Sequence, residues 1–399
     1  MAKLWQRKGK DMEPDAEKYT VGNDYILDAE LIPYDIRASK AHAKMLAAKG
    51  YLSKKELNSL LKGLDEIGTL HSQGKFVIKA EDEDCHTAIE NYLVTLFGDV
   101  GKKIHTARSR NDQSMTALRL LFMDKLAQIV RDAEALQTAL GEFSKNNKGV
   151  PMPGYTHMRK AMPTTVNTLV QAYQDMISDD IALIKSVLDI INKNPLGSAA
   201  GFGVPLDIDR TMTTKELGFA SVQLNPIHCA NSRGKYESLV AYSLFSIMQS
   251  LNKIAIDLIL FSMPEFGYIT LPPSMCTGSS IMPQKQNPDV LELVRANAHI
   301  VHGNLVKING IILNLPSGYN RDFQLTKGPV LESLHITSAS LRIMTKLFRK
   351  LETENQKLKA AMTPELFATM RVYDLVKKGM PFRDAYKKVA SDKKSNLQF

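Results

Sequence analysis

The sequence predicts an all-α fold organised around a bundle of long helices. Apolar side chains recur at steps of three and four residues, the period of an amphipathic helix, over several long stretches. These stretches are 118–143, 166–191, 231–263, 289–313 and 329–357. Very little of the chain alternates with the two-residue period of a half-buried strand. Several helices longer than the globular mean indicate an elongated helical bundle.

Length and composition are typical of a globular protein with more than one domain. A chain of 399 residues with 44% hydrophobic and 23% charged side chains is too long for one compact core. We expect a mainly helical N-terminal domain over 1–105, a central helical bundle domain over 106–360 and a short C-terminal helical domain over 361–399.

The N-terminal region consists of short segments interrupted by glycine and proline. Ser53 followed by Glu56 predicts a capping box that begins a helix running through Leu61. The acidic run 81–86 could suggest a metal site, but it lacks the glycine and the spacing of a calcium loop. We favour a solvated helix start followed by an apolar face. The residues of that face are Ala88, Ile89 and Leu93.

The first long helix is the best marked. Its apolar stripe consists of Leu118, Phe122, Leu126, Ile129, Ala133, Leu136, Leu140 and Phe143. Two prolines and two glycines over 149–154 end it, and a second reversal follows over 194–203. The glycines of that reversal have no following Lys-Ser/Thr, so a turn is favoured over a phosphate-binding loop.

Cysteine usage and hydropathy indicate a cytoplasmic protein. Cys85, Cys229 and Cys276 are scattered without metal-ligand spacing, which fits a reducing compartment. No signal peptide is recognisable at the N-terminus. The most apolar segment, 240–263, contains polar and charged residues and is expected to be a buried helix and not a membrane span.

The formal charge of +9 has two interpretations: a nucleic-acid footprint, or attraction of a polyanionic small molecule. Many cations lie late in the chain, among them Lys346, Arg349, Lys350, Lys377, Lys378, Lys387, Lys388, Lys393 and Lys394. No nucleic-acid motif surrounds them, so a solvated basic tail is favoured. We expect no nucleic-acid partner and no membrane association.

Residues 277–292, TGSSIMPQKQNPDVLE, form a loop whose side chains could take part in catalysis. Prolines exclude a helix interior, and a helix is expected to begin near Asn287 as N-cap. The loop carries two adjacent hydroxyls beginning with Ser279, a cation at Lys285 and a helix-start carboxylate at Glu292. Such a set can take a proton from carbon and stabilise the resulting charge. The alternative is a surface loop before a capped helix.

A second unusual stretch, 103–113, reads KIHTARSRNDQ. Arg108 and Arg110 can each form a bidentate clamp on a carboxylate. The alternative is a polar helix cap, because Asn111 and Asp112 precede a long helix. The two interpretations are compatible.

The third stretch, 154–163, reads GYTHMRKAMP and precedes another long helix. His157 lies beside Thr156 among polar neighbours, which fits proton transfer. A single histidine in such a place can equally be a satisfied structural residue.

These stretches carry a resemblance. Residues 277–292 resemble the signature of the fumarase/aspartase superfamily, whose members eliminate a group β to a carboxylate and release fumarate. Residues 103–113 resemble the His-Thr-Gly-Arg-Ser-Arg-Asn-Asp-Gln block of the argininosuccinate lyase family, and 154–163 its Pro-Gly-Tyr-Thr-His block. Residues 319–327 resemble its Tyr-Asn-Lys-Asp-Leu-Gln block. The similarity extends over about 4–383.

The resemblance implies a fumarase/aspartase-like fold of three domains with a central long-helix bundle, and it implies residue roles. Ser279 would be the base and Lys285 would stabilise the enolate-like dianion. His157, oriented by Glu292, would be the proton donor or its relay. The implied substrate-binding residues are Ser109, Arg110, Asn111, Thr156, Arg233, Asn287, Tyr319, Gln324 and Lys327.

The resemblance also implies the reaction and the assembly: reversible cleavage of argininosuccinate to arginine and fumarate, a step of arginine biosynthesis, without metal or organic cofactor. Family members are homotetramers whose active sites are shared between subunits. Two alternatives remain: another fumarate-releasing enzyme such as adenylosuccinate lyase, or a non-catalytic crystallin-like structural protein on the same scaffold.

Several positions depart from the family pattern. Ala107 stands where glycine is usual, and Met158-Arg159-Lys160 replaces Leu-Gln-Arg. Leu325 and Thr326 stand where acidic residues are common, Gly22 falls near a usual serine, and the C-terminus is short. We expect Leu325 and Thr326 to affect recognition of the arginine end. We expect the Ala107 methyl to crowd the substrate or shift the backbone, and the short C-terminus to trim the third domain.

Overall fold

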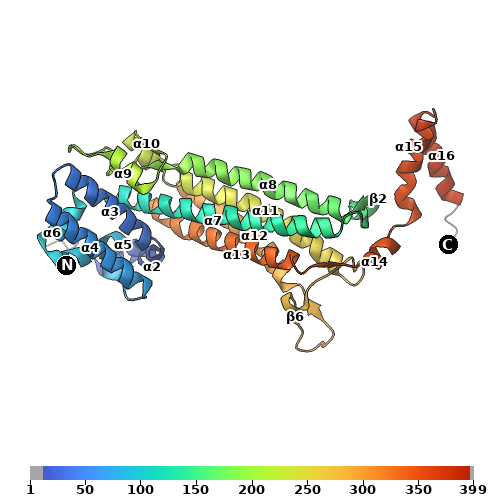
Figure 1. The fold of residues 1–399 in the computed structure, drawn as a ribbon, viewed down its shortest axis with the longest axis horizontal. Helices are drawn as coiled ribbons and strands as arrows, with labels where there is room; N and C mark the ends of the chain where they lie inside the picture. The colour runs from blue at the N-terminus through green and yellow to red at the C-terminus, as the bar shows by residue number, and fades with distance from the viewer. Residues whose placement is uncertain (1–11, 396–399) are drawn as a thin grey trace. The chain divides into compact units, whose positions relative to one another are not determined.

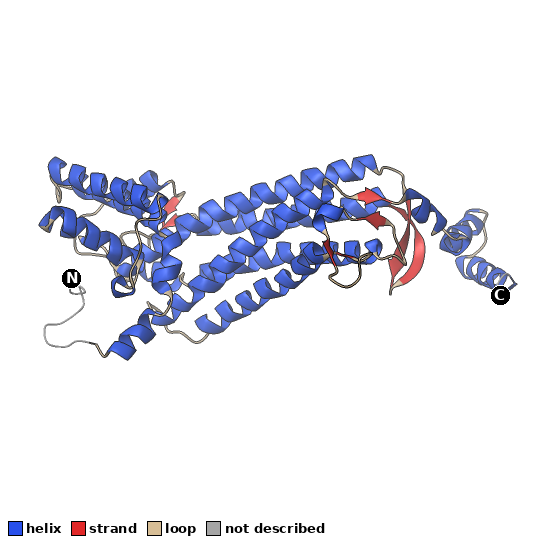
Figure 2. Cartoon of the chain, turned by 90° about the horizontal axis from the view of Figure 1, so that it is seen from below, coloured by secondary structure: helices blue, strands red, loops and turns tan. Residues whose placement is uncertain are grey.

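The computed structural model describes residues 12–395, and side chains through residue 391. The first eleven and last four residues of the predicted terminal domains, and the side chains of Lys393 and Lys394, lie outside that description. The all-α prediction is confirmed: helices dominate, and within residues 12–395 the strands form two-stranded sheets only (Figure 2).

The chain divides into two compact units. Unit 1 comprises Met1–Val130, Leu183–Phe245 and Ile300–Ile336, and unit 2 comprises Arg131–Ala182, Ser246–His299 and Thr337–Phe399. Each of the long helices contributes to both units. They are α7 (Arg110–Asn146), α8 (Val166–Ile191), α11 (Lys235–Ser262), α12 (Asp289–Ile312) and α13 (Lys327–Phe348) (Figure 1). The three-domain division at 1–105, 106–360 and 361–399 stays a prediction.

The remaining elements of unit 1 are short helices, 3-10 turns and one pair of strands. They are α1 (Pro14–Val21), α2 (Asp24–Leu27), η1 (Asp28–Glu30), α3 (Ile32–Ala48), α4 (Lys54–Ser72), η2 (Ala80–Asp82), α5 (Cys85–Phe97), α6 (Asp99–Lys102), η3 (Lys103–His105), β3 (Lys193–Asn194), α9 (Arg210–Leu217), β4 (Ser221–Val222), α10 (Pro226–Asn231) and η5 (Arg321–Thr326).

The remaining elements of unit 2 include three pairs of antiparallel strands and a terminal helical pair. They are β1 (Pro151–Thr156), β2 (Arg159–Thr165), β5 (Ile269–Thr270), η4 (Pro273–Met275), β6 (Thr277–Gly278), β7 (Gln286–Asn287), β8 (Glu352–Thr353), α14 (Asn355–Ala360), η6 (Pro364–Phe367), α15 (Ala368–Lys377) and α16 (Phe382–Ser395). Val372, Ala385 and Val389 pack α15 against α16.

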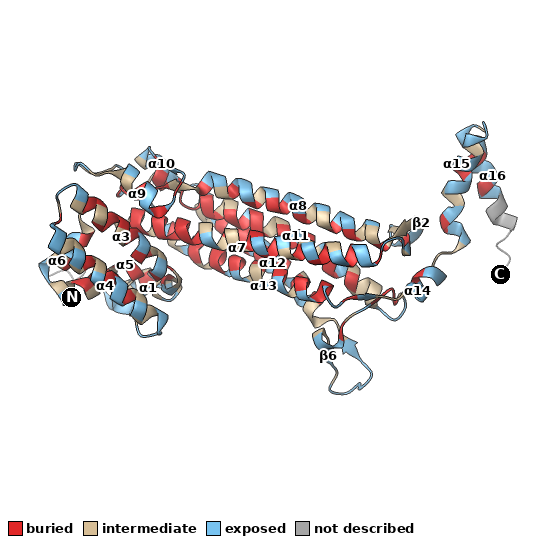
Figure 3. Ribbon diagram, viewed as in Figure 1, coloured by how far each residue is buried: buried red, intermediate tan, exposed pale blue. Residues whose placement is uncertain are grey.

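The helical stripes predicted from periodicity are buried. All eight members of the α7 stripe are at most 5% exposed (Figure 3). The capping box of Ser53 and Glu56 is present, and the helix it begins runs to Ser72, beyond the predicted end at Leu61. On α5, Asp84 is the N-cap, and the predicted apolar face is buried.

Two predicted helices are shorter than expected. The stretch 231–263 is broken at Gly234, whose φ is 72° and where an added Cβ would collide with Ile312, so α11 begins at Lys235. The helix predicted over 329–357 ends at Phe348.

The helix α11 covers the apolar segment for which we predicted burial. Among the described residues it is the one helix whose length and apolar composition would allow it to cross a membrane. Its apolar stripe is buried, as in the core helix of a folded domain. The stripe includes Val240, Leu244, Ile247, Leu251, Ile254 and Leu258.

The hairpin of β1 and β2 was not predicted. Its strands pair from Pro151↔Thr165 to Thr156↔Arg159, with an irregularity between Pro153 and Tyr155. Two residues, His157 and Met158, connect the strands at φ of 52° and 57°. Positive φ at both central residues is the pattern of a type I′ turn, which matches the twist of antiparallel strands.

Candidate functional site

Unit 1 contains a polar cavity of about 540 Å³. Its lining comes from four separate parts of the chain: α2 with η1, the segment from η2 to the start of α7, the turn before α11, and the region around η5. Seven of the substrate-binding residues predicted from the sequence line it. They are Ser109, Arg110, Asn111, Arg233, Tyr319, Gln324 and Lys327.

The N-terminus of α7 is anchored at the cavity by Asp112. This buried carboxylate accepts hydrogen bonds from the backbone N–H of Ser109, Gly197 and Ala199, each at 2.9 Å. Burial raises the pKa of Asp112, although these three donors oppose the rise. The N–H of Asn111 donates to Ser109 Oγ at 3.3 Å. The prediction that Asn111 and Asp112 precede the helix is wrong, because α7 begins at Arg110 and both lie in its first turn. Asp112 caps the helix from there, within the predicted binding block.

The two arginines of this block point to different partners. Arg110 Nη2 donates to Glu90 Oε2 at 2.7 Å, and Nη1 donates to Gln113 Oε1 at 2.8 Å. Arg108 is only 8% exposed and donates from Nη1 to Ser39 Oγ at 2.8 Å. Both arginines line the cavity, but Arg108 is largely committed to the core.

Lys327 lies at the inner end of the η5 region and is 2% exposed. Its ammonium donates to Asp24 Oδ1 at 2.7 Å and makes a shorter bond to Asp28 Oδ1. Burial opposes the charge, but Asp28 and Asp24 outweigh it and raise the pKa of Lys327. A fixed, fully charged ammonium therefore sits in the cavity wall.

The η5 turn is tied to the end of α1. Gln324 Nε2 donates to the carbonyls of Thr20 and Val21 at 3.1 Å each, and Arg321 Nη2 donates to Thr20 O at 2.9 Å. Tyr319 is 38% exposed at the cavity. Gly22, where a serine is usual in the family, directly follows α1 at a φ of 53°.

Arg233 enters the cavity wall from the turn before α11. Its Nε donates to Glu237 Oε1 at 3.2 Å, and its guanidinium lies 5.9 Å from the centre of the Phe323 ring. Of the two departures in the 319–327 block, Leu325 is exposed, whereas Thr326 is buried and donates to Phe323 O. Acidic side chains from other segments line the cavity instead. They are Asp24, Asp28, Glu81, Glu83, Asp84 and Glu90.

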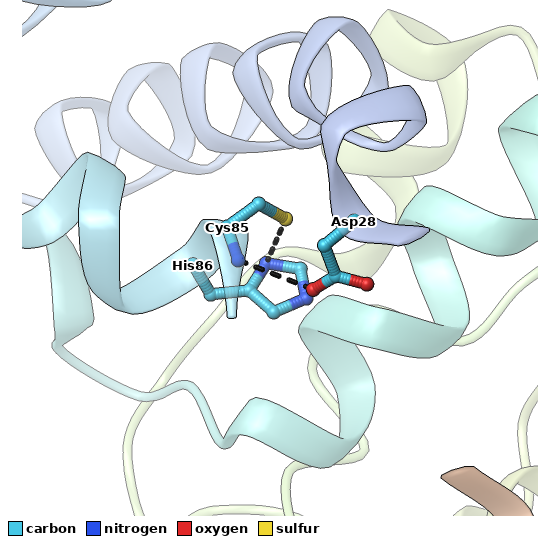
Figure 4. Close-up of side chains that lie close together, drawn as sticks. All are labelled: Asp28, Cys85 and His86. Carbon is cyan, nitrogen blue, oxygen red and sulfur yellow. Dashed lines mark hydrogen bonds between the residues drawn. The ribbon is translucent and has the colours of Figure 1, made fainter. Parts of the chain in front are cut away.

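Asp28, Cys85 and His86 form a buried cluster of potential metal ligands beside the cavity (Figure 4). Asp28 accepts from Lys327 and from the Cys85 N–H, and His86 Nδ1 lies 3.1 Å from Asp35 Oδ1, whereas the buried His86 Nε2 has no hydrogen-bond partner among the described residues. Burial raises the pKa of the Cys85 thiol well above its ordinary value, which disfavours the thiolate. We therefore assign no metal to this cluster.

Unit 2 carries the predicted proton donor at the tip of the β1–β2 hairpin. Thr156 ends β1, and His157 occupies the first position of the two-residue turn, with both side chains exposed. A positive φ is uncommon for a non-glycine residue, although His tolerates it better than most. The turn therefore holds His157 in a strained backbone conformation at an exposed tip.

The 277–292 loop is a second exposed hairpin of unit 2. Its base is the pairing of β6 with β7, and the loop between these strands projects away from the helices (Figures 1 and 3). Thr277 donates to Asp289, and Asn287 Nδ2 donates to Gly278 O at 3.4 Å. Asn287 thus pairs across the loop and is not the N-cap of α12, which begins at Asp289. Lys285 and Glu292 are exposed.

The hydroxyl of Ser279 has a distinctive environment. Its Oγ accepts hydrogen bonds from the backbone N–H of Ile281 at 3.3 Å and of Met282 at 3.1 Å. Donors to a hydroxyl oxygen favour its deprotonated form over the neutral alcohol. Within the described residues, no hydrogen bond or ion pair joins Ser279 to His157, Lys285 or Glu292.

Comparison with known proteins agrees with these motifs. The lyase family model matches residues 14–303. Argininosuccinate lyase of Thermotoga neapolitana is 50% identical over 97% of this chain and 97% of its own. That of Sorangium cellulosum is 41% identical over 98% of this chain and 90% of its own. The chain belongs to the argininosuccinate lyase family.

Solved structures extend the likeness to the superfamily fold. An EDDS lyase in complex with formate has a TM-score of 0.82 at 23% identity, covering 96% of this chain and 76% of that one. A class II fumarase from Schistosoma mansoni has a TM-score of 0.79 at 17% identity, covering 94% and 91%. The predicted fumarase/aspartase-like fold of this family member is confirmed.

Several residues of the cavity wall of this family member could not be recognised from the family blocks. Asp28 bonds to Lys327, Glu90 bonds to Arg110, and His86 lines the same cavity, yet none of the three lies in the family blocks. One signal was present: His86 and Glu90 are four residues apart on the face of α5 that also buries Cys85 and Leu93. Ionisable side chains at apolar positions of a helix indicate a buried polar site.

Proposed function

We propose that this protein cleaves argininosuccinate to arginine and fumarate. The observation that carries the proposal is the convergence of seven predicted binding residues, six from two family blocks (103–113 and 319–327) and Arg233, on one cavity of about 540 Å³. The cavity presents guanidinium groups and an ammonium for carboxylates, and carboxylates for a guanidinium. A ligand that carries both kinds of charge fits this lining.

The proposed reaction is a β-elimination. Ser279 removes a proton from the carbon beside the one that bears the leaving nitrogen, and the electron pair is stabilised by the adjacent carboxylate and Lys285. The carbon–nitrogen bond then breaks, the electron pair becomes the double bond of fumarate, and His157, oriented by Glu292, delivers a proton to the departing guanidino nitrogen. Two backbone N–H groups on Ser279 Oγ support its role as base.

The binding roles follow the same proposal. Ser109, Asn111, Thr156 and Asn287 hold carboxylates of the succinyl half. Arg110 and Arg233 add fixed positive charge, and the η5 region holds the arginine half through Tyr319, Gln324 and Lys327.

We further propose a cytoplasmic homotetramer with active sites shared between subunits. The exposed positions of His157, Lys285 and Glu292 support it, because exposed catalytic side chains need neighbours that exclude water. Apolar side chains exposed on α12, including Leu293, Ile300 and Val306, support helix packing between chains.

The test is fumarate release, followed by absorbance, with argininosuccinate and adenylosuccinate in parallel. We expect turnover of argininosuccinate alone, and a Ser279→Ala variant that binds substrate without turnover. Ser280→Ala is the matched control, because it removes the neighbouring hydroxyl and should keep activity. Turnover of adenylosuccinate instead, or none by a folded tetramer, would overturn the proposal in favour of the other lyase or the structural protein.

A further inference from the structure

Glu90 lies outside every family block, yet it lines the same cavity as the predicted binding residues. It belongs to α5, one turn after His86, and is 8% exposed. A carboxylate this deeply buried needs a partner to compensate for lost hydration. Its position on a buried helix face therefore requires an explanation from its contacts.

The main partner of Glu90 is Arg110 at the first position of α7. The Nη2–Oε2 distance is 2.7 Å, within the range of a charge-assisted hydrogen bond. His105 Nδ1 lies 3.4 Å from the same oxygen. Burial favours the neutral acid, but the hydrogen bond from His105 and the charge of Arg110 prevail and lower the pKa of Glu90. Glu90 is therefore an ionised anchor.

Arg110 needs such an anchor because of where it sits. A cation in the first turn of a helix is repelled by the positive end of the helix dipole, and a nearby carboxylate removes that penalty. Gln113 Oε1 takes a second N–H of the same guanidinium at 2.8 Å. Glu90 and Gln113 fix the plane of the group, Nη1 also lies 3.4 Å from His105 Nδ1, and the remaining N–H donors are left for other acceptors.

Arg108 shows that the block alone does not decide this orientation. It lies two residues earlier, and its guanidinium donates to Ser39 in the core. The guanidinium of Arg110 points to the cavity instead, where α5 supplies the carboxylate of Glu90.

We propose that Glu90 is a positioning residue: it holds the Arg110 guanidinium so that its remaining donors form a clamp for a carboxylate of the ligand. The proposal rests on the proposed function for the nature of that ligand. It differs from two simpler roles for Glu90, namely direct contact with the ligand and support of the α5–α7 packing alone.

A double-mutant cycle separates these roles. Wild type, Glu90→Gln, Arg110→Gln and the double variant are compared by fumarate release from argininosuccinate. We expect each single variant to raise KM about tenfold to a hundredfold, the value of one charge-assisted hydrogen bond, with kcat changed far less. The double variant should be no worse than Arg110→Gln alone. Losses that multiply in the double variant, or a loss confined to kcat, would overturn the proposal.

Glu66→Gln is the matched control, since Glu66 also offers a carboxylate to α5, accepting from Tyr92 Oη at 2.6 Å away from the cavity. It should leave KM unchanged. A comparable rise in KM in this control would mean that any lost contact to α5 suffices, and would count against positioning. Thermal melting confirms that each variant folds, and Glu90→Asp, which keeps the charge on a shorter side chain, replaces Glu90→Gln should that variant unfold.

A ligand-free crystal structure of the Glu90 variant provides a readout that does not depend on turnover. We expect the Arg110 guanidinium to leave its position beside Gln113. An unmoved guanidinium would overturn the positioning role. If the wild type releases no fumarate from argininosuccinate, the proposed function fails, and the crystal structure still decides the role of Glu90.

Discussion

Replacing Lys327 by methionine tests how the cavity wall is held together. Methionine approximates the length and volume of the lysine stem but has no ammonium. The substitution leaves Asp28, which is 1% exposed, and Asp24, whose side chain is 16% exposed, without their cation. Asp28 keeps one hydrogen bond, from the Cys85 N–H at 3.1 Å.

The expected cost follows from the burial of the partners. Removing one member of a buried ion pair typically destabilises a protein by about 3–5 kcal/mol, because a charge remains buried without compensation. We expect a loss of about 3–5 kcal/mol, a factor of roughly 10²–10⁴ in the unfolding equilibrium. Adding Asp28→Asn removes the stranded charge and should recover about 1–3 kcal/mol.

Urea denaturation followed by circular dichroism, at one fixed protein concentration, measures these differences. Lys49→Met is the control: Lys49 pairs with Asp207 at 2.8 Å at the surface and should leave the transition midpoint unchanged. The reasoning is refuted if Lys327→Met unfolds at the wild-type urea concentration, or if Asp28→Asn deepens the loss instead of relieving it.

Three further predictions concern strain and titration. Ala107 has a φ of 61°, so Ala107→Gly should stabilise the protein by about 1 kcal/mol, measured as a higher urea midpoint. Met158 has a φ of 57°, and Met158→Gly should raise the melting temperature while His157 keeps its place and kcat stays within about twofold of wild type; a lower melting temperature would contradict the turn assignment. For the pair of Asp35 and His86, burial opposes both charges, yet the pKa of Asp35 is lowered and that of His86 raised. The Asp35 carboxylate stabilises the fold above its ordinary pKa of 3.8, and this stabilisation is lost as pH falls through its folded pKa. The His86 imidazolium stabilises the fold below its ordinary pKa of 6.5, and this stabilisation is lost as pH rises through its folded pKa. The stability difference between wild type and Asp35→Asn should therefore be greatest between pH 3.8 and 6.5, and a difference that is flat across pH would rule out the charged pair.

The helical part of the fold could be predicted because periodicity reports burial directly. The predicted helix over 166–191 matches α8 at both ends. The β1–β2 hairpin could not be predicted in the same way. Its first strand contains Pro153 and Gly154, which read as a loop, and its turn is His-Met instead of the Asn-Gly typical of type I′ turns. Strand pairing over such a sequence depends on tertiary context.

The residues of the site also fall into those that the sequence predicts and those that it does not. Residues inside family blocks could be assigned because the blocks are specific, and six of the binding residues predicted from them line one cavity. Their partners could not, since Lys327 and Asp28 are 299 positions apart and no local pattern links them. Glu90 lies 20 positions before Arg110, on another helix, and only the packing of α5 against the start of α7 brings them together.

These partners change how the charge of the protein should be understood. The chain carries a formal charge of +9, which by itself favours attraction of a polyanion. The cavity is different: six lysines and arginines line it together with six aspartates and glutamates. Lys327 and Arg110 are each held by a carboxylate at 2.7 Å. Their cationic groups are therefore fixed in position, and their charge is largely balanced. A balanced wall attracts a simple polyanion weakly, but it can align a ligand that carries a guanidinium at one end and carboxylates at the other. Recognition then comes from the orientation of paired charges, and each buried carboxylate that orients a cation contributes to it.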